Sequence, residues 1–176
     1  MRRALLIGLA VTSLAATGCS TDETILGKPT CPEDLVLVAQ SVPDAALVPC
    51  FEGLPGGWTV SSVSIGHNGT AVKFDSDRAG FGAATFSYTG HCDVAGIGRL
   101  PSEQDDVEVY EEIEQLAGGL ESTRYFVFSR GCVTARFDFD GFDDKEYAQD
   151  LLDSMLLISR EGLNESLQQQ NEAFEV

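Results

Sequence analysis

The sequence predicts an α+β domain in which a mainly antiparallel sheet carries one long C-terminal helix on one face. Segments with apolar residues at every second position recur between residues 59 and 139, and such alternation is typical of strands that are buried on one side. A helical pattern with a capping residue begins at Asp143. The strands come first and do not alternate with helices, which favours antiparallel over parallel pairing.

The N-terminal segment has the pattern of an export signal. Arg2 and Arg3 precede a mostly apolar run from Ala4 to Ala16, and small residues follow. A charged start, a short apolar stretch and small residues at the end are typical of a cleaved signal peptide. The apolar run is shorter than the roughly 20 residues of a membrane-spanning helix. Residues 1–18 are therefore predicted to be removed on export.

Cys19 directly follows Ala16-Thr17-Gly18, and this arrangement resembles the lipobox of bacterial lipoproteins. The resemblance implies that the signal is cut before Cys19 and that its thiol carries a diacylglyceryl group. The expected location is the extracytoplasmic face of the cell membrane. An ordinary signal with an incidental cysteine is the alternative. The polar residues 19–30 would then form a tether, which spans at most about 40 Å when extended.

The composition restricts the partners. The net charge is −17, and removal of residues 1–18 with their two arginines makes it −19. Such a chain repels the phosphates of nucleic acids and anionic lipid headgroups, so nucleic acid is not an expected partner and membrane attachment depends on the lipid. The hydrophobic fraction of 43% is normal for a globular domain. We predict one domain over residues 31–163, monomeric, and a flexible tail over 164–176.

The remaining cysteines predict two disulfides, because an even number of cysteines in an exported chain usually pairs. These residues are Cys31, Cys50, Cys92 and Cys132. Three connectivities are possible, and we favour Cys31–Cys50 with Cys92–Cys132. No Cys-x-x-Cys spacing is present and the histidines are isolated, so no metal site and no cofactor are predicted.

The segment before the first clear strand is ambiguous. Acidic residues and a proline precede Leu35–Ala39, as in the first turn of a helix, but its apolar run suits a strand equally well. Pro43 and Pro49 interrupt the chain after it. The single tryptophan, Trp58, is expected to pack at the edge of the core.

Two hairpins are predicted from their turns. Asn68-Gly69 joins two alternating segments as a two-residue turn, which would place Ile65 opposite Val72 and Val63 opposite Phe74. Arg130-Gly131 would place Phe128 opposite Val133 and Phe126 opposite Ala135, again apolar on apolar. The stretches 83–88 and 106–113 are expected to be further strands, although 106–113 also suits a helix.

The long helix is predicted to run from Asp143, its N-cap, to Gly162. Glu146 stands three residues after Asp143, as in a capping box. An apolar stripe that includes Tyr147, Leu151 and Met155 would pack on the sheet.

The order of elements resembles the Mog1/PsbP-like sandwich found in some bacterial lipoproteins. The motifs VPC, PGGW, SDRAG and GCVT, within about Val48–Phe139, also resemble an uncharacterised set of actinobacterial membrane-anchored proteins. This resemblance implies a compartment and a fold, and it implies no catalytic residues.

No segment predicts a catalytic site. His91-Cys92-Asp93 contains a thiol, a base and an acid, but adjacent side chains rarely converge and Cys92 is needed for a disulfide. The acidic residues between Asp138 and Glu146 lack the spacing of a calcium loop. Glutamates at 108, 111, 112 and 114 could supply a carboxylate pair for glycoside hydrolysis.

The expected function is therefore a non-enzymatic binding or interaction domain, anchored by lipid in the cell envelope. It would present its sheet to an envelope protein or a small ligand. The alternative is a cell-envelope hydrolase that uses a pair of carboxylates.

Overall fold

A computed structural model of the chain describes residues 35–51, 53–115, 118–141 and 144–164. The predicted signal, Cys19, the tether, Cys31 and the tail from 165 onward lie outside these ranges.

The main layer is a seven-stranded sheet in which all neighbouring strands are antiparallel, in the order β2-β3-β4-β8-β7-β6-β5. Its strands are β2 Trp58–Gly66, β3 Gly69–Ser76, β4 Gly80–Thr89, β5 Gly98–Leu100, β6 Glu108–Gln115, β7 Gly119–Phe128 and β8 Gly131–Asp140. The predicted strand at 83–88 falls within β4, and the one predicted at 106–113 overlaps β6, so the second stretch is a strand and not a helix.

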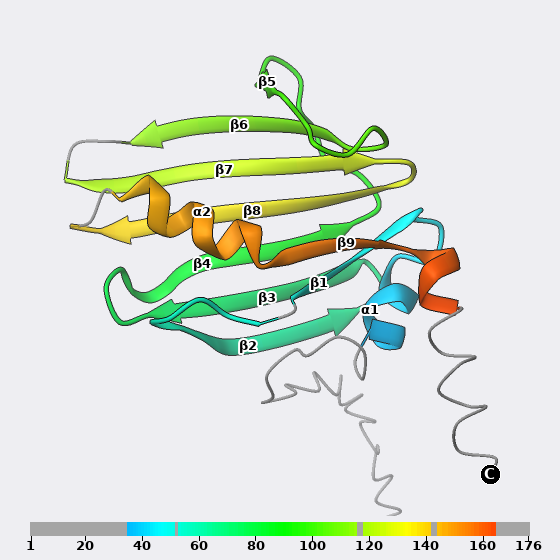
Figure 1. The fold of residues 1–176 in the computed structure, drawn as a ribbon, viewed down its shortest axis with the longest axis horizontal. Coiled ribbons are helices and arrows are strands. Elements are labelled where there is room, and N and C mark those ends of the chain that lie inside the picture. The colour runs from blue at the N-terminus through cyan, green and yellow to red at the C-terminus, as the bar shows by residue number, and fades with distance from the viewer. Residues whose placement is uncertain (1–34, 52, 116–117, 142–143, 165–176) are drawn as a thin grey trace, which may run out of the picture.

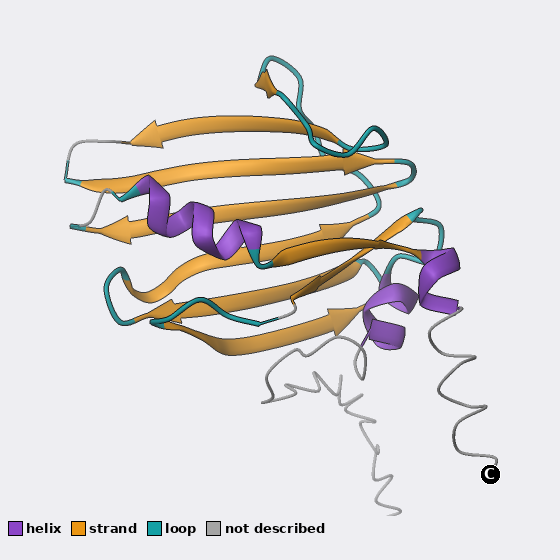
Figure 2. Ribbon diagram, viewed as in Figure 1, coloured by secondary structure: helices purple, strands orange, loops and turns teal. Residues whose placement is uncertain are grey.

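A second, smaller layer crosses one face of the sheet (Figures 1 and 2). It consists of a two-stranded ribbon, β1 Leu47–Phe51 paired antiparallel with β9 Met155–Ser159, and helix α2, Lys145–Asp153. Helix α1, Leu35–Ser41, lies near one end of β2 and β3. The fold is thus mostly antiparallel β structure and resembles a β-sandwich.

The predicted long C-terminal helix, and with it the α+β class, is wrong. Helix α2 ends at Asp153, and the following residues form β9. Apolar side chains such as Leu156 and Leu157 suit a strand as well as a helix, and β1 supplies backbone partners for them. Pairing with a strand more than 100 positions away in the sequence therefore overrides the local helical pattern.

The start of α2 also differs from the prediction. The N-cap is Asp144, whose side chain accepts hydrogen bonds from the backbone N–H groups of Glu146 and Tyr147. Such bonds satisfy N–H groups that have no partner inside the helix. Asp143, the predicted cap, lies outside the described residues.

Both hairpins exist, but their predicted registers are wrong by two positions. Val63 lies opposite Val72 instead of Phe74, and Phe126 lies opposite Val133 instead of Ala135. The residue just before each predicted turn pair belongs to the turn, and Gly69 and Gly131 are the first residues of the returning strands. A shift of two keeps every side chain on its predicted face, so apolar alternation could not reveal it.

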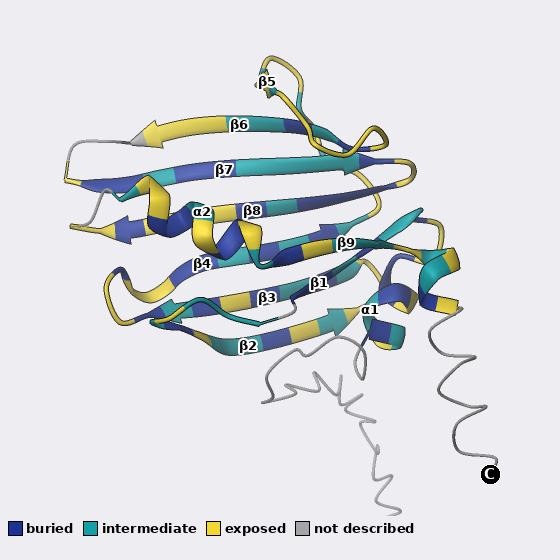
Figure 3. Cartoon of the chain, viewed as in Figure 1, coloured by how far each residue is buried: buried dark blue, intermediate teal, exposed yellow. Residues whose placement is uncertain are grey.

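The core lies between the two layers (Figure 3). Aromatic rings from both layers meet there: Phe51 of β1 lies 5.1 Å, centre to centre, from Phe74 and from Phe86 of the sheet. Trp58 is 4% exposed and stacks on Tyr147 of α2 at 4.9 Å. Burial of these rings removes a large apolar area from water and holds the ribbon and α2 on the sheet.

One predicted disulfide is confirmed. Cys92 and Cys132 are bonded, with their Cα atoms 5.8 Å apart, so the loop after β4 is fastened to the start of β8. Cys50 is also disulfide-bonded. Its predicted partner Cys31 lies outside the described residues, and that pairing stays a prediction.

Arg160 joins the second layer to the end of α1. Its guanidinium donates to the backbone carbonyls of Ala39, Val42 and Ala45, each at 2.6 Å. Carbonyls at the end of a helix have no partner inside it, and a cation there also opposes the negative end of the helix dipole. The position of β9 is thereby tied to the segment before β1.

Candidate functional site

A cleft of about 540 Å³ opens between the β5–β7 side of the sheet and the α2–β9 segment. Nine of its fifteen lining residues are apolar, and polar groups at the β5–β6 loop, on α2 and at Arg124 supply at least as much of its exposed surface. The lining residues are Leu100, Pro101, Ser102, Glu103, Gln104, Val107, Val109, Arg124, Phe126, Gln149, Leu152, Asp153, Met155, Leu156 and Leu157. We refer to this feature as the Arg124 cleft.

A smaller hollow of about 240 Å³ adjoins the Arg124 cleft under α2. The two share Arg124, Gln149 and Leu152 as lining residues. The contact between Arg124 and Gln149 therefore forms a bridge from the sheet to α2 at the boundary between the two spaces.

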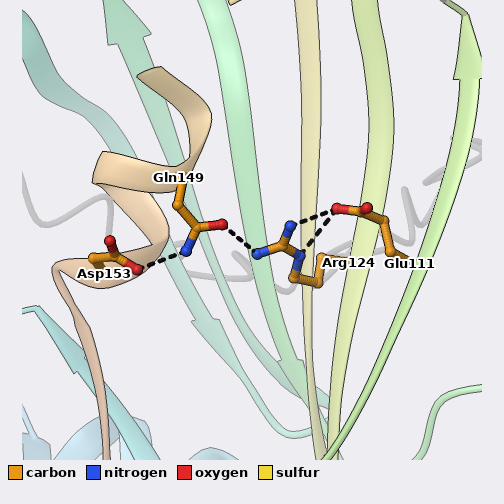
Figure 4. Close-up of polar contacts among 4 residues, drawn as sticks. All are labelled: Glu111, Arg124, Gln149 and Asp153. Carbon is orange, nitrogen blue, oxygen red and sulfur yellow. Dashed lines mark hydrogen bonds and ion pairs between the residues drawn. The ribbon is translucent and has the colours of Figure 1, made fainter. Parts of the chain in front are cut away.

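Four side chains form a continuous polar chain across this boundary (Figure 4). Arg124 donates through Nε and Nη2 to Glu111 Oε1, at 3.1 and 2.6 Å, and through Nη1 to Gln149 Oε1 at 2.7 Å. Gln149 Nε2 donates to Asp153 Oδ1 at 2.6 Å. The chain aligns β6, β7 and α2 with four hydrogen bonds, each of which has a charged partner, and such bonds are stronger than neutral ones.

Strand pairing holds Arg124 in place. Arg124 and Glu111 are directly opposite each other on β7 and β6, and their side chains are only 19% and 22% exposed. A guanidinium has five N–H groups, and three of those of Arg124 donate to Glu111 and Gln149. The Arg124 side chain also lines the cleft.

The predicted carboxylate group is divided between the two faces of β6. Glu111 faces the cleft side with Val109, whereas Glu108 and Glu112 point to the opposite face because side chains alternate along a strand. Glu108 instead contacts Arg99 Nη2 at 3.1 Å and accepts from the hydroxyl of Tyr110. Glu111 therefore does not converge with Glu108 or Glu112 in the way that a hydrolase would require.

Two tyrosines on that opposite face have perturbed hydroxyls. The hydrogen bond to Glu108 raises the pKa of Tyr110, because ionisation would place two negative charges together. Burial raises the pKa of Tyr125, and the nearby charge of Glu112 adds to the effect. Both hydroxyls therefore stay protonated, and neither is activated as a nucleophile or base.

The other residues considered from the sequence lie away from the cleft. Cys92 is in the disulfide, so His91-Cys92-Asp93 offers no free thiol. His67 lines a separate, shallow hollow with Asp44 and Arg130. Within the described ranges no three His, Cys, Asp or Glu side chains are grouped to hold a metal ion, and Asp143 of the acidic segment lies outside them.

Sequence reasoning missed Arg124 and Gln149. A signal for Arg124 was present: it occupies the same face of its strand as Ser122 and Phe126, and a charge on the covered face of a strand requires a partner. Gln149 had no comparable signal, since a glutamine on a helix is ordinarily a surface residue.

Comparisons with known proteins found no match to the chain among protein-family models, curated proteins or solved structures. The resemblances to bacterial lipoproteins, to the Mog1/PsbP-like sandwich and to the actinobacterial set stay predictions. Among the residues that the structure describes, no helix has the length and apolar character needed to cross a membrane.

Proposed function

We propose that this protein is a non-enzymatic binding domain that is held at the outer side of the cell membrane by lipid on Cys19 and binds its ligand in the Arg124 cleft. The observation that carries the binding role is the polar bridge of Arg124 and Gln149 in a cleft that apolar residues of β5, β6, β7 and β9 also line. Apolar walls with a few fixed polar groups are characteristic of binding sites. The apolar walls would supply affinity, and the bridge would orient the ligand.

The electrostatics of the site favour binding over hydrolysis. Glu111 is engaged by Arg124 at 2.6 Å, so its carboxylate is held as the partner of a cation. Asp153 accepts from Gln149. A hydrolase of this type needs two carboxyl groups that flank one bond of the substrate, whereas each of these two is held by a neighbouring side chain of the protein.

The anchor has a direct test. We expect the mature protein to partition with membranes and to begin at a Cys19 that carries acyl mass, as measured by intact mass spectrometry of the membrane fraction. Cys19→Ala should release the protein into the soluble extracytoplasmic fraction. A wild-type mature chain that begins at Cys19 without acyl mass would refute the anchor and leave the binding role standing.

Binding in the cleft can be measured with Nile red, an uncharged apolar dye. We expect saturable fluorescence enhancement that Gln104→Trp weakens at least about fivefold, because the indole would occupy apolar space in the cleft. Asp105→Trp is the matched control: it adds the same side chain to the same loop at a residue outside the cleft lining. Equal dye binding by both variants, or none by the wild type, would contradict a binding site here.

A further inference from the structure

We propose that the occupant of the Arg124 cleft is an extended, basic polypeptide segment of a partner protein, which pairs as an added strand with the free edge of β9. This rests on the proposed function, because the segment would lie in the same cleft. The inference follows from the backbone of β9, from the protection of the other strand edges and from the charges that line the cleft.

The direction of the β9 backbone groups follows from its pairing with β1. The N–H of Arg160 donates to the carbonyl of Ala46, one step beyond the pair of Leu47 and Ser159. In an antiparallel ladder, bonded and non-bonded pairs alternate. The bonded pairs are therefore those of Ile158 and Leu156, and the N–H and C=O groups of Leu157 point away from β1.

Leu157 thus offers a donor and an acceptor to the space on the other side of β9, where it lines the cleft together with Met155 and Leu156. Among the described strands, none pairs with this side of β9. Met155 and Ser159 have the same backbone orientation as Leu157. A row of donors and acceptors at every second residue is complemented by the edge of another strand.

The two edges of the β1–β9 ribbon differ in their protection. The outer edge of β1 contains Pro49, which has no N–H to offer, and the carbonyl of Leu47 already accepts from the Tyr88 hydroxyl at 2.9 Å. The sequence of β9, Met155 to Ser159, contains neither proline nor a charged residue. Native proteins usually blunt exposed strand edges with such residues, so the unprotected edge of β9 indicates an edge that is used.

The edges of the large sheet are blunted in other ways. β5 has only three residues, and β2 is irregular between Val60 and Ser62, where its register shifts. Short edge strands and bulges both discourage strand addition. The β9 edge therefore stands out among the described strands.

The cleft also defines the chemistry of the segment. Glu103 and Asp153 line it, whereas its cation, Arg124, is paired with Glu111. The excess negative charge favours lysine or arginine in the segment. Apolar residues at alternate positions would face Phe126 and the other apolar walls, since every second side chain of a strand points the same way.

The test uses the full-length protein and a synthetic peptide of alternating valine and lysine, capped at both ends. Two further versions carry backbone N-methyl groups, one on the valines and the other on the lysines. Strand addition uses the N–H groups of one set only, so we expect the two methylated versions to differ in affinity at least about tenfold, since each lost hydrogen bond contributes about 1 kcal/mol. The unmethylated peptide should also slow hydrogen exchange of the Leu157 amide at least about tenfold.

Each outcome bears on the proposal separately from the proposed function. Equal affinities for the two methylated peptides, or peptide binding without protection of Leu157, would overturn strand addition. Absence of peptide binding while Nile red still binds the cleft would also overturn it, yet it would leave the cleft as a binding site. Asp153→Asn should weaken binding of the unmethylated peptide about threefold at low salt, and an unchanged affinity would overturn the assignment of a basic segment.

Discussion

Replacing Gly69 with alanine is expected to lower the free energy of unfolding by about 3 kcal/mol, because both backbone strain and overlap would result. Gly69 begins β3 with φ at +135°, a conformation that L-residues rarely adopt, and an added Cβ would overlap the backbone carbonyl oxygen of Tyr88 on β4. That carbonyl belongs to a central strand of the sheet, so it cannot move away without disturbing its neighbours. Urea denaturation followed by the fluorescence of Trp58 would measure the loss.

Gly66→Ala is the matched control for this prediction. Gly66 lies opposite Gly69 at the same turn, but its φ is not in the positive range and an added Cβ would meet its nearest neighbour, the carbonyl oxygen of Gly69, only at 4.0 Å. We expect a change within about 0.5 kcal/mol, as for substitutions away from strained positions. Similar urea midpoints for both variants would show that the turn relaxes and that Gly69 is not required.

Removal of the disulfide in Cys92→Ala/Cys132→Ala is expected to destabilise the protein by about 4 kcal/mol. The two cysteines are 40 positions apart, and closing a loop of this length removes about that much entropy-derived free energy from the unfolded chain. The residues between them include all of β5, β6 and β7. The unfolded chain would therefore gain freedom over almost half of the sheet.

Thr134→Val separates the covalent constraint from local packing. The hydroxyl of Thr134 lies 3.2 Å from Cys92 Sγ, so this variant loses the polar contact and keeps the disulfide. We expect a loss of about 1 kcal/mol or less, measured by the same denaturation. If the double-alanine variant is as stable as Thr134→Val, the disulfide does not stabilise the protein by restricting the unfolded chain.

Local patterns predicted several elements correctly because both their turns and their alternation depend on neighbouring residues. The alternation of Ala84, Phe86 and Tyr88 indicated one buried face, and all three are at most 3% exposed. Alternation cannot distinguish registers that differ by two, since both place the same side chains inward. Gly69 lies so close to Tyr88 of β4 that residue 69 cannot carry a side chain. Because β4 is not part of the β2–β3 hairpin, the sequence pattern of the hairpin does not reveal this contact.

The candidate site was less accessible to sequence reasoning. The sequence shows the glutamates of β6 as a group. Which of them faces the cleft depends on which side chains of the strand point to each face of the sheet and on what covers that face. Arg124 and Gln149 are 25 positions apart and meet because α2 packs over β7. The cleft itself exists because the chain continues from α2 into β9, which leaves space beside the β5–β6 side of the sheet.

Turn residues and apolar alternation predicted the longer strands of the large sheet and their buried faces, and the cysteine count favoured the pairing of Cys92 with Cys132, because each of these depends on short-range preferences or on a small number of choices. The strands β1, β5 and β9 were not predicted. Tertiary structure decided the end of the C-terminal helix, the registers and the site. Residues 155–159 suit a helix or a strand about equally by themselves, and the backbone hydrogen bonds offered by β1 make the strand the more stable state. The free edge of β9, and with it the proposed mode of binding, exists only as a result of that pairing.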